Sequence, residues 1–333
     1  MAEQQNIIPY TEEERNDLTA KSKAMLNAAL EKGNLKKVLE TMGRNSKFTL
    51  NNTLLILAQK PNATVAKNVQ DWNAIGRTVK EGEFSMEIMK PIKEKTLTPI
   101  LENGREKLDE NGEVMMKSRE ETKGFQPSYV FDISQTQGEE YTPFKISKEI
   151  TDDEKHTVMR GVRRALQNRR YKIVFVDENK LPEGKRSATN RKERTVQIKK
   201  GMDNYATVLT VLHESGKALT GSMKYGDFGG FQGEEAYMLE SACADCILAS
   251  HFGMNTEKYD FSYTTAWNDE EKEKFYQTAK VVCRGVGSIM ENVDNAFAYT
   301  AQSGSEGAGA GAAAEPALSL FRGKQQTSEM VAS

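Results

Sequence analysis

The chain has 333 residues, which is long enough for two ordinary domains or one large one, each with a hydrophobic core. Hydrophobic residues make up 38% of it and charged residues 28%, a balance typical of globular proteins that leaves no run of about 18 apolar residues to span a membrane. The formal net charge of −2 identifies no class of partner, while a polar N-terminus and only three cysteines predict a cytoplasmic protein in a reducing compartment.

The N-terminal part predicts three helices. Residues 11–32 begin with Thr11 and a run of acids, followed by apolar side chains at helical spacing. A second helix is predicted for residues 50–59, and a third within residues 65–75, which Gly76 ends.

Two strands are predicted next, separated by a polar insertion. Residues 83–90 alternate in hydrophobicity, and residues 128–136 are rich in β-branched and aromatic side chains. Residues 93–123 between them are charged and lack aromatic side chains, which predicts a flexible loop. We take residues 1–141 as a first, α+β domain.

One segment of this domain, residues 48–83, combines polar amides, an aromatic ring and cations within a basic stretch. Residues 34–80 hold eight Lys or Arg against two acids, a net charge of +6. Single-strand binders need rings that stack on bases beside cations that hold phosphates, so the segment predicts nucleic-acid contacts by Asn51, Asn52, Lys67, Trp72, Arg77 and Lys80. The structural alternative is a core position for Trp72 and solvated positions for the cations.

A second, mostly helical domain with a small β-sheet is predicted for residues 142–300, which makes the whole chain α+β. After a linker at 142–150, the predicted elements are helix 151–168, strands 171–178 and 195–200, and helices 204–219, 234–252 and 269–292. The first of these helices carries further candidate nucleic-acid contacts, Arg160, Arg163 and Arg164. They lie within residues 156–200, where fourteen Lys or Arg against four acids give a net charge of +10. The low-complexity tail, residues 301–333, is predicted to be disordered.

The helix predicted at 204–219 contains HESGK, a variant of the zinc-peptidase motif H-E-x-x-H. In that motif two histidines one helical turn apart hold the ion, and the glutamate after the first acts on the metal-bound water. His213 and Glu214 stand in the expected positions, and Glu240 on the next helix is the candidate third ligand. Lys217 replaces the second histidine and presents an ammonium group instead of a nitrogen lone pair.

Lys217 leaves three alternatives open. In the first, the charge of Lys217 lies where the ion would be and pairs with Glu214 and Glu240, without metal. In the second, Zn²⁺ is held by the residual ligands His213 and Glu240, with Glu214 as the catalytic residue. In the third, these are ordinary helix-surface residues. His251 follows Glu240 by about three helical turns, roughly 16 Å, and so lies too far away to share an ion.

Several separated motifs together resemble one family. NNTLLILAQKPNAT, a following tryptophan, IGRTVKEGE and VFDISQT occur in the order found in the N-terminal single-stranded-DNA-binding domain of ArdC-type antirestriction proteins and LtrC-like proteins of conjugative elements. The second half is similar to their zincin domain, which resembles ImmA/IrrE-type metallopeptidases. The resemblance covers residues 35–267 without the insertion and implies His213 and Glu240 as zinc ligands and Glu214 as the catalytic glutamate. Lys217 departs from the family pattern.

This resemblance implies an accessory protein of a mobile element, which binds single-stranded DNA with an antirestriction role and carries a degenerate zinc-peptidase domain. One alternative is an active zinc metallopeptidase that cleaves a host or element protein. Another is a scaffold for a host restriction or regulatory protein. No membrane partner is expected.

Overall fold

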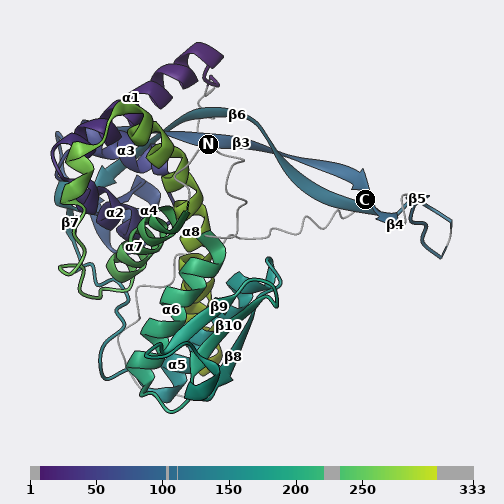
Figure 1. Ribbon diagram of the computed structural model, residues 1–333. Coiled ribbons are helices and arrows are strands. Elements are labelled where there is room, and N and C mark those ends of the chain that lie inside the picture. The colour runs from purple at the N-terminus through teal and green to yellow at the C-terminus, as the bar shows by residue number, and fades with distance from the viewer. Residues whose placement is uncertain (1–7, 103–104, 111, 221–232, 306–333) are drawn as a thin grey trace.

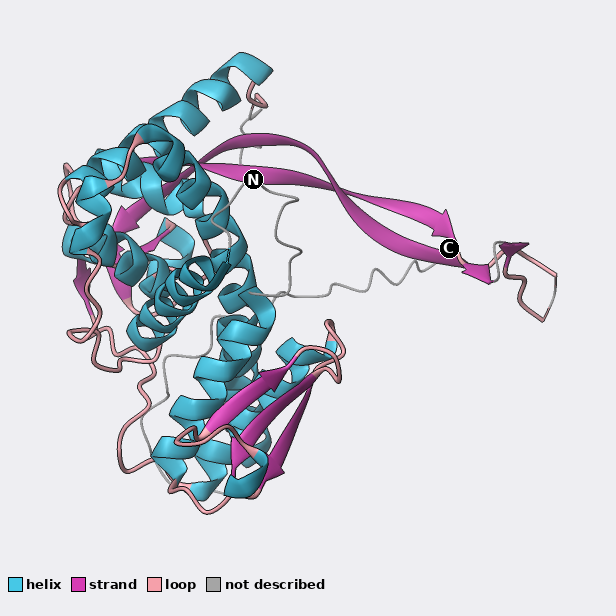
Figure 2. Ribbon diagram, in the orientation of Figure 1, coloured by secondary structure: helices cyan, strands magenta, loops and turns pink. Residues whose placement is uncertain are grey.

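The computed structural model of the protein describes residues 8–102, 105–110, 112–220 and 233–305. Helices and small sheets combine in an α+β fold, as the sequence predicts (Figure 2). One group of helices packs at the base of a long two-stranded ribbon, and a second group carries a small separate sheet (Figure 1).

The chain begins with three helices, α1 (Glu12–Glu31), α2 (Leu35–Arg44) and α3 (Leu50–Gln59). A capping box fixes the start of α1: the Thr11 hydroxyl accepts from the backbone N–H of Glu14, and the Glu14 carboxylate accepts from that of Thr11. The predictions for α1 and α3 are confirmed. Helix α2 is an element that the sequence reading missed, although Leu35, Val38, Leu39 and Met42 are buried at helical spacing.

The helix predicted within residues 65–75 is shorter than expected. Strand β1 (Ala66–Lys67) occupies its start, and helix α4 (Val69–Asn73) begins only after Asn68. The backbone N–H of Ala66 donates to the side chain of Asn45, while Asn68 caps α4 by accepting from the N–H of Asp71. These two bonds hold the chain extended up to Asn68.

A long antiparallel ribbon of β3 (Met86–Pro99) and β6 (Met116–Asp132) follows the short strand β2 (Arg77–Val79). Strand β1 pairs with β6, and β7 (Thr136–Gly138), after the 3-10 turn η1 (Ile133–Gln135), pairs with β2. Two short strands, β4 (Leu101–Glu102) and β5 (Arg105–Glu106), pair near the far end of the ribbon.

The expectation of a loop at residues 93–123 is wrong, because most of this segment is the outer part of the ribbon, here called the arm. Its strands pair from Lys93↔Thr122 to Pro99↔Met116, and an ion pair of 3.1 Å joins Lys93 to Glu120 across them. Polar and charged residues alternate on both strands, so pairing here depends on cross-strand partners and not on a buried apolar face.

The second group contains α5 (Asp152–Gln167), β8 (Lys172–Val176), the 3-10 turn η2 (Glu178–Lys180), β9 (Ser187–Asn190), β10 (Thr195–Lys199) and α6 (Asn204–Thr220). The strands lie in the order β8-β10-β9, with β8 parallel and β9 antiparallel to the central β10. Strand β9 was not predicted, because its sequence SATN carries no apolar alternation.

Two further helices, α7 (Gly233–His251) and α8 (Asp269–Ser305), follow, with the 3-10 turn η3 (Ser262–Ala266) between them. Helix α8 is longer than predicted and includes residues 301–305 of the tail predicted to be disordered; residues 306–333 lie outside the described part. No helix within the described residues is long and apolar enough to cross a membrane.

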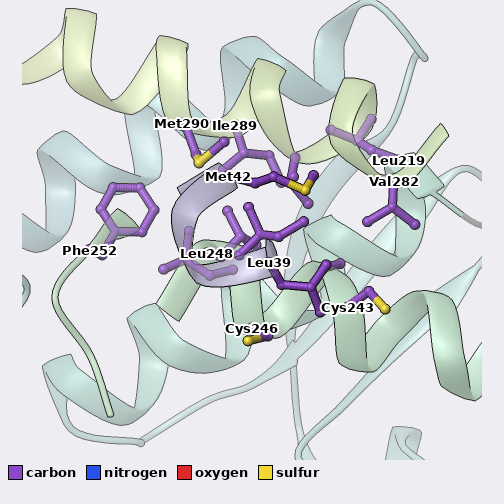
Figure 3. Close-up of a cluster of buried hydrophobic side chains, with 14 of the residues drawn as sticks. Leu39, Met42, Leu219, Cys243, Cys246, Leu248, Phe252, Val282, Ile289 and Met290 are labelled. Atoms are coloured by element: carbon purple, nitrogen blue, oxygen red, sulfur yellow. The ribbon is translucent and has the colours of Figure 1, made fainter. Parts of the chain in front are cut away.

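One buried cluster contains residues from both predicted domains. Leu39 and Met42 of α2 lie among Leu248 of α7 and Ile289 and Met290 of α8 (Figure 3). The segment predicted as a linker contributes Ile146 and Ile150 to the same cluster. Helices of the first predicted domain therefore pack directly on helices of the second, and the boundary at residues 141 and 142 remains a prediction.

Helices α2 and α7 approach each other closely at Gly43. A Cβ atom added there would lie 2.4 Å from the carbonyl oxygen of Ile247. We expect Gly43→Ala to lower the free energy of unfolding by about 1–3 kcal/mol, because a methyl group must force the two helices apart. Urea unfolding followed by circular dichroism measures this change.

Gly287→Ala in α8 is the matched control, since nothing lies within 4 Å of the Cβ atom it adds. It should leave the free energy of unfolding unchanged or raise it by up to about 1 kcal/mol through helix propensity. Equal losses in the two variants would contradict the steric explanation.

Candidate functional site

The HESGK residues lie on α6, where His213 faces Asp245 of α7. The Nδ1 atom of His213 is 2.8 Å from Oδ2 of Asp245, and the side chain of His213 is 40% exposed. A carboxylate at Nδ1 favours the tautomer with its proton there, which leaves the lone pair on Nε2. Metal-binding histidines are oriented in the same way by a carboxylate behind the ring.

Glu214 lies between α6 and β9 with a side chain that is only 3% exposed, and its Oε1 atom is 3.9 Å from Nε2 of His213. Its carboxylate accepts hydrogen bonds from Thr189 at 2.6 Å, Ser187 at 3.0 Å and Nζ of Lys217 at 3.0 Å. Burial alone would raise the pKa of Glu214, but the Thr189 hydrogen bond and the Lys217 charge outweigh it and hold this pKa below its ordinary value. Glu214 is therefore an ionised, fully bonded carboxylate.

Lys217 forms the predicted ion pair with Glu214 but not the predicted pair with Glu240. Although burial acts to lower the pKa of Lys217, the charge of Glu214 outweighs it and raises this pKa. The ammonium group also lies 5.3 Å from the ring centre of Tyr237. Within the part of the chain that the structure describes, no hydrogen bond or ion pair joins Lys217 to Glu240.

Glu240 is half-buried on α7 without a hydrogen-bond partner among the described residues. Burial raises the pKa of this carboxyl group to about 7, and the positive charge of Arg191 opposes the shift only in part. The side chain is thus partly protonated near neutral pH, unlike Glu214.

These residues do not fit the zinc site that the family resemblance implies. Both carboxylate oxygens of Glu214 accept hydrogen bonds, and Lys217 places an ammonium group beside them. Over the described ranges, with 221–232 outside them, no three His, Cys, Asp or Glu side chains come together as a metal site. His213 retains an oriented Nε2 atom, but one such donor does not make a tetrahedral site.

His251 has a separate structural position, as its place on the helix predicts. Its Nδ1 atom is 2.9 Å from the carbonyl oxygen of Gly43, and Nε2 is 3.0 Å from Oδ1 of Asp294. The ring therefore joins α7 to both α2 and α8.

A groove of about 1220 Å³ lies elsewhere in the molecule. Its walls are the turn after α2, the base of the ribbon, residues 140–145, and the chain around the end of α7. Five cations line it: Arg44, Lys47, Lys67, Lys90 and Lys145. The lining also contains three acids, Asp71, Glu140 and Asp294, and the half-buried rings of Phe48, Tyr141 and Phe144.

Lys67 lies between two rings on one wall of this groove. Its Nζ atom is 5.8 Å from the ring centre of Trp72 and 5.5 Å from that of Tyr141. Burial, with a smaller effect from the like charge of Lys47, lowers the pKa of Lys67. Cation–π contacts stabilise the ammonium form where water is partly excluded.

The predicted nucleic-acid contacts of the first domain divide between the groove and the interior. Lys67 and Asn52 line the groove, but the Asn52 amide is buried and bonds both N–H and C=O of Met89. Trp72 is fully buried, and its indole N–H donates to the carbonyl of Phe131. Asn51 accepts from the hydroxyl of Tyr276. A buried indole presents no face to a base, so the core alternative describes Trp72.

The remaining predicted cations lie outside the groove. The guanidinium of Arg77 donates to Thr136 and to the carbonyl of Glu139, and Lys80 donates to the carbonyl of Ser134 at 2.9 Å. On α5, Arg160 is exposed and donates to Thr157 and Thr300, while Arg163 and Arg164 are exposed on the same helix. The three arginines of α5 form a second basic surface, distinct from the groove.

Sequence reasoning missed most of the groove residues. Tyr141, Phe144 and Lys145 stand in a segment interpreted as the end of one domain and a linker, and Lys90 stands at the end of a predicted strand. A local signal existed in the run YTPFK, in which two aromatic side chains and a cation lie within five residues.

No family model and no curated protein matches the chain. Two solved structures of the antirestriction protein ArdC from the R388 plasmid are similar to it. The metal-free one has a TM-score of 0.36 at 16% identity, covering 74% of this chain and 85% of that one. The Mn(II)-bound one has a TM-score of 0.38 at 14% identity, and the match covers 84% of this chain and 98% of that one. A likeness this low carries no functional assignment.

Replacing Lys217 tests whether the lysine is what prevents metal binding. Lys217→His restores the second imidazole of H-E-x-x-H, so we expect the variant to purify with about one zinc per chain. Lys217→Met removes the ammonium group without adding a ligand and is the control; it and the wild type should contain no stoichiometric zinc. Elemental analysis of protein purified without chelator measures the zinc content. A Lys217→His variant without zinc would contradict the explanation that Lys217 is what prevents metal binding.

Glu240→Gln tests the perturbed carboxyl group. The pKa of Glu240 is about 7 in the folded state against an ordinary value of 4.5, so the folded state binds more protons between these pH values. Stability therefore falls as pH rises through this window. The variant, which cannot ionise, should be more stable than the wild type above pH 7 by about 1–2 kcal/mol, after allowance for partial solvent exposure.

The difference in stability between Glu240→Gln and the wild type should vanish below pH 4.5, the ordinary pKa of this group. Unfolding curves recorded from below this pH to above pH 7 measure it. Glu291→Gln on the exposed face of α8 is the control and should follow the wild type at every pH. A constant difference at all pH values would show a packing effect instead of a titration.

Proposed function

We propose that the chain binds single-stranded DNA in the groove between the turn after α2, the base of the ribbon and the end of α7. The observation that carries the proposal is the composition of the groove walls, which contain five cations and three half-buried rings beside three acids. Cations that follow a backbone and rings on which bases stack are the two components of sequence-tolerant single-strand binding.

The charges in the groove support this ligand. Lys47, Lys90 and Lys145 are exposed, so their side chains are accessible to the phosphates of a bound strand. Of the three acids in the lining, Asp294 is bonded by Nε2 of His251 at 3.0 Å. The exposed arginines of α5 supply a second positive surface for a longer strand.

The sequence resemblance extends this proposal to a biological role: an accessory protein of a mobile element with an antirestriction activity, whose peptidase domain is degenerate. The ion pair of Lys217 with Glu214 supports the last part, because it satisfies the glutamate without metal. A host restriction or regulatory protein is a further proposed partner.

A zinc metallopeptidase is the second candidate function. It is favoured by the orientation of His213, whose Nδ1 atom faces Asp245 while Nε2 lies 3.9 Å from Oε1 of Glu214. Stoichiometric zinc in the wild-type protein, together with peptide hydrolysis lost in Glu214→Gln, would establish it over the metal-free proposal.

Neutralising two exposed groove lysines tests DNA binding. We expect Lys47→Gln/Lys90→Gln to weaken binding of a labelled oligonucleotide and to make the plot of log affinity against log salt less steep by about 1.4, near 0.7 for each phosphate contact. Fluorescence anisotropy at several salt concentrations measures both quantities.

The matched control is Lys21→Gln/Lys32→Gln, which removes the same charge from exposed positions of α1 and its C-terminal cap, outside the groove. Its slope should equal that of the wild type. If both double variants lose the same affinity, binding depends only on net charge, and the groove is not the site.

A further inference from the structure

The arm projects from the helices as an isolated two-stranded ribbon (Figure 1). Strand β1 covers β6 only at Phe131 and Asp132, and the backbone of Tyr10 bonds β6 only at Phe125. On β3, the side chains of Gln59 and Asn52 bond the backbone of Glu87 and Met89. Within the arm, no described backbone group pairs with the outer edge of residues 93–99 or 116–123. A two-stranded ribbon with both edges open is marginally stable in water and is a template for further pairing.

The arm also exposes large apolar side chains where its strands end. Leu97 is 66% exposed and Leu101 63%. The exposed side chains of Leu108, Val114, Met115 and Met116 extend this apolar patch. Large apolar side chains exposed together on one part of a protein are typical of an interaction site.

The charges of the arm favour a protein as the partner over a nucleic acid or an anionic membrane. Residues 93–123 contain seven Lys or Arg and eight Asp or Glu, a net charge of −1. Surfaces that bind phosphates carry an excess of positive charge. The partner is therefore a protein.

The distribution of charge along the arm is self-complementary. Its tip, residues 100–115, holds five acids and two bases, a net charge of −3. Its stem, residues 93–99 and 116–123, holds five bases and three acids, a net charge of +2. The apolar patch lies at the junction of tip and stem, around Leu97, Leu101 and Met116.

We propose that the arm binds the arm of a second copy of this chain, antiparallel and around a two-fold axis at the apolar patch. In this pairing Leu97 and Leu101 of the two copies meet at the axis. Each acidic tip then lies along the basic stem of the other copy. Two-fold pairing covers the same patch on both subunits and leaves no open apolar surface.

Charge-reversal variants of the full chain test the pairing. Lys93→Glu/Lys95→Glu makes the stem acidic, and Glu102→Lys/Glu106→Lys makes the tip basic, so each variant repels itself. Sedimentation velocity should show a concentration-dependent dimer for the wild type and a dissociation constant raised about tenfold or more for each variant alone. An equimolar mixture of the two variants should restore the dimer, because opposite charges then face each other again.

Removing the apolar patch gives an independent test. Leu97→Gln/Leu101→Gln should lose the dimer, whereas Phe84→Gln, at a residue 89% exposed just before β3, should keep it. Circular dichroism checks that every variant is folded. The proposal is overturned by a wild type that stays monomeric at its highest soluble concentration, by a dimer that survives removal of the patch, or by charge variants that fail to pair when mixed.

Discussion

The close packing of α2 against α7 and α8 is the contact on which the rest of the molecule depends. Gly43 lets the backbones of α2 and α7 meet, and His251 then bonds the carbonyl of Gly43 on one side and Asp294 on the other. The same contact brings the turn after α2 beside the end of α7, which creates two walls of the groove. Core packing and the proposed binding surface therefore have a common origin.

Elements with local signals could be predicted from the sequence, and elements that depend on distant partners could not. Helices α3, α6 and α7 follow from their apolar periodicity, and α1 from its cap at Thr11. The arm was missed because its residues alternate Lys, Glu and Thr, and such a strand is identified only by the partner across from it. Trp72 was ambiguous because a ring in a polar segment suits both a core and a stacking surface.

In the candidate site, too, contacts between neighbours in sequence could be predicted and contacts between distant residues could not. The ion pair of Lys217 with Glu214 follows from helical spacing, since the two residues lie one turn apart. Asp245, Thr189 and Ser187 lie far from them in sequence, and only the packing of α7 and β9 on α6 makes them partners. The groove could not be predicted either. Three of its five cations lie in the basic stretch 34–80, but its walls form only when residues near 44, 90, 145 and 250 are brought together.

The order of the groove walls along the chain has a consequence for biosynthesis. One set of walls comes from residues 44–145, and the other from residues 250–294, at the end of α7 and within α8. Translation therefore delivers the first walls long before the second, and a ribosome-bound chain that ends before α8 has no complete groove. A ligand that needs both sets of walls therefore binds only after α8 has been synthesised and has packed on α2 and α7.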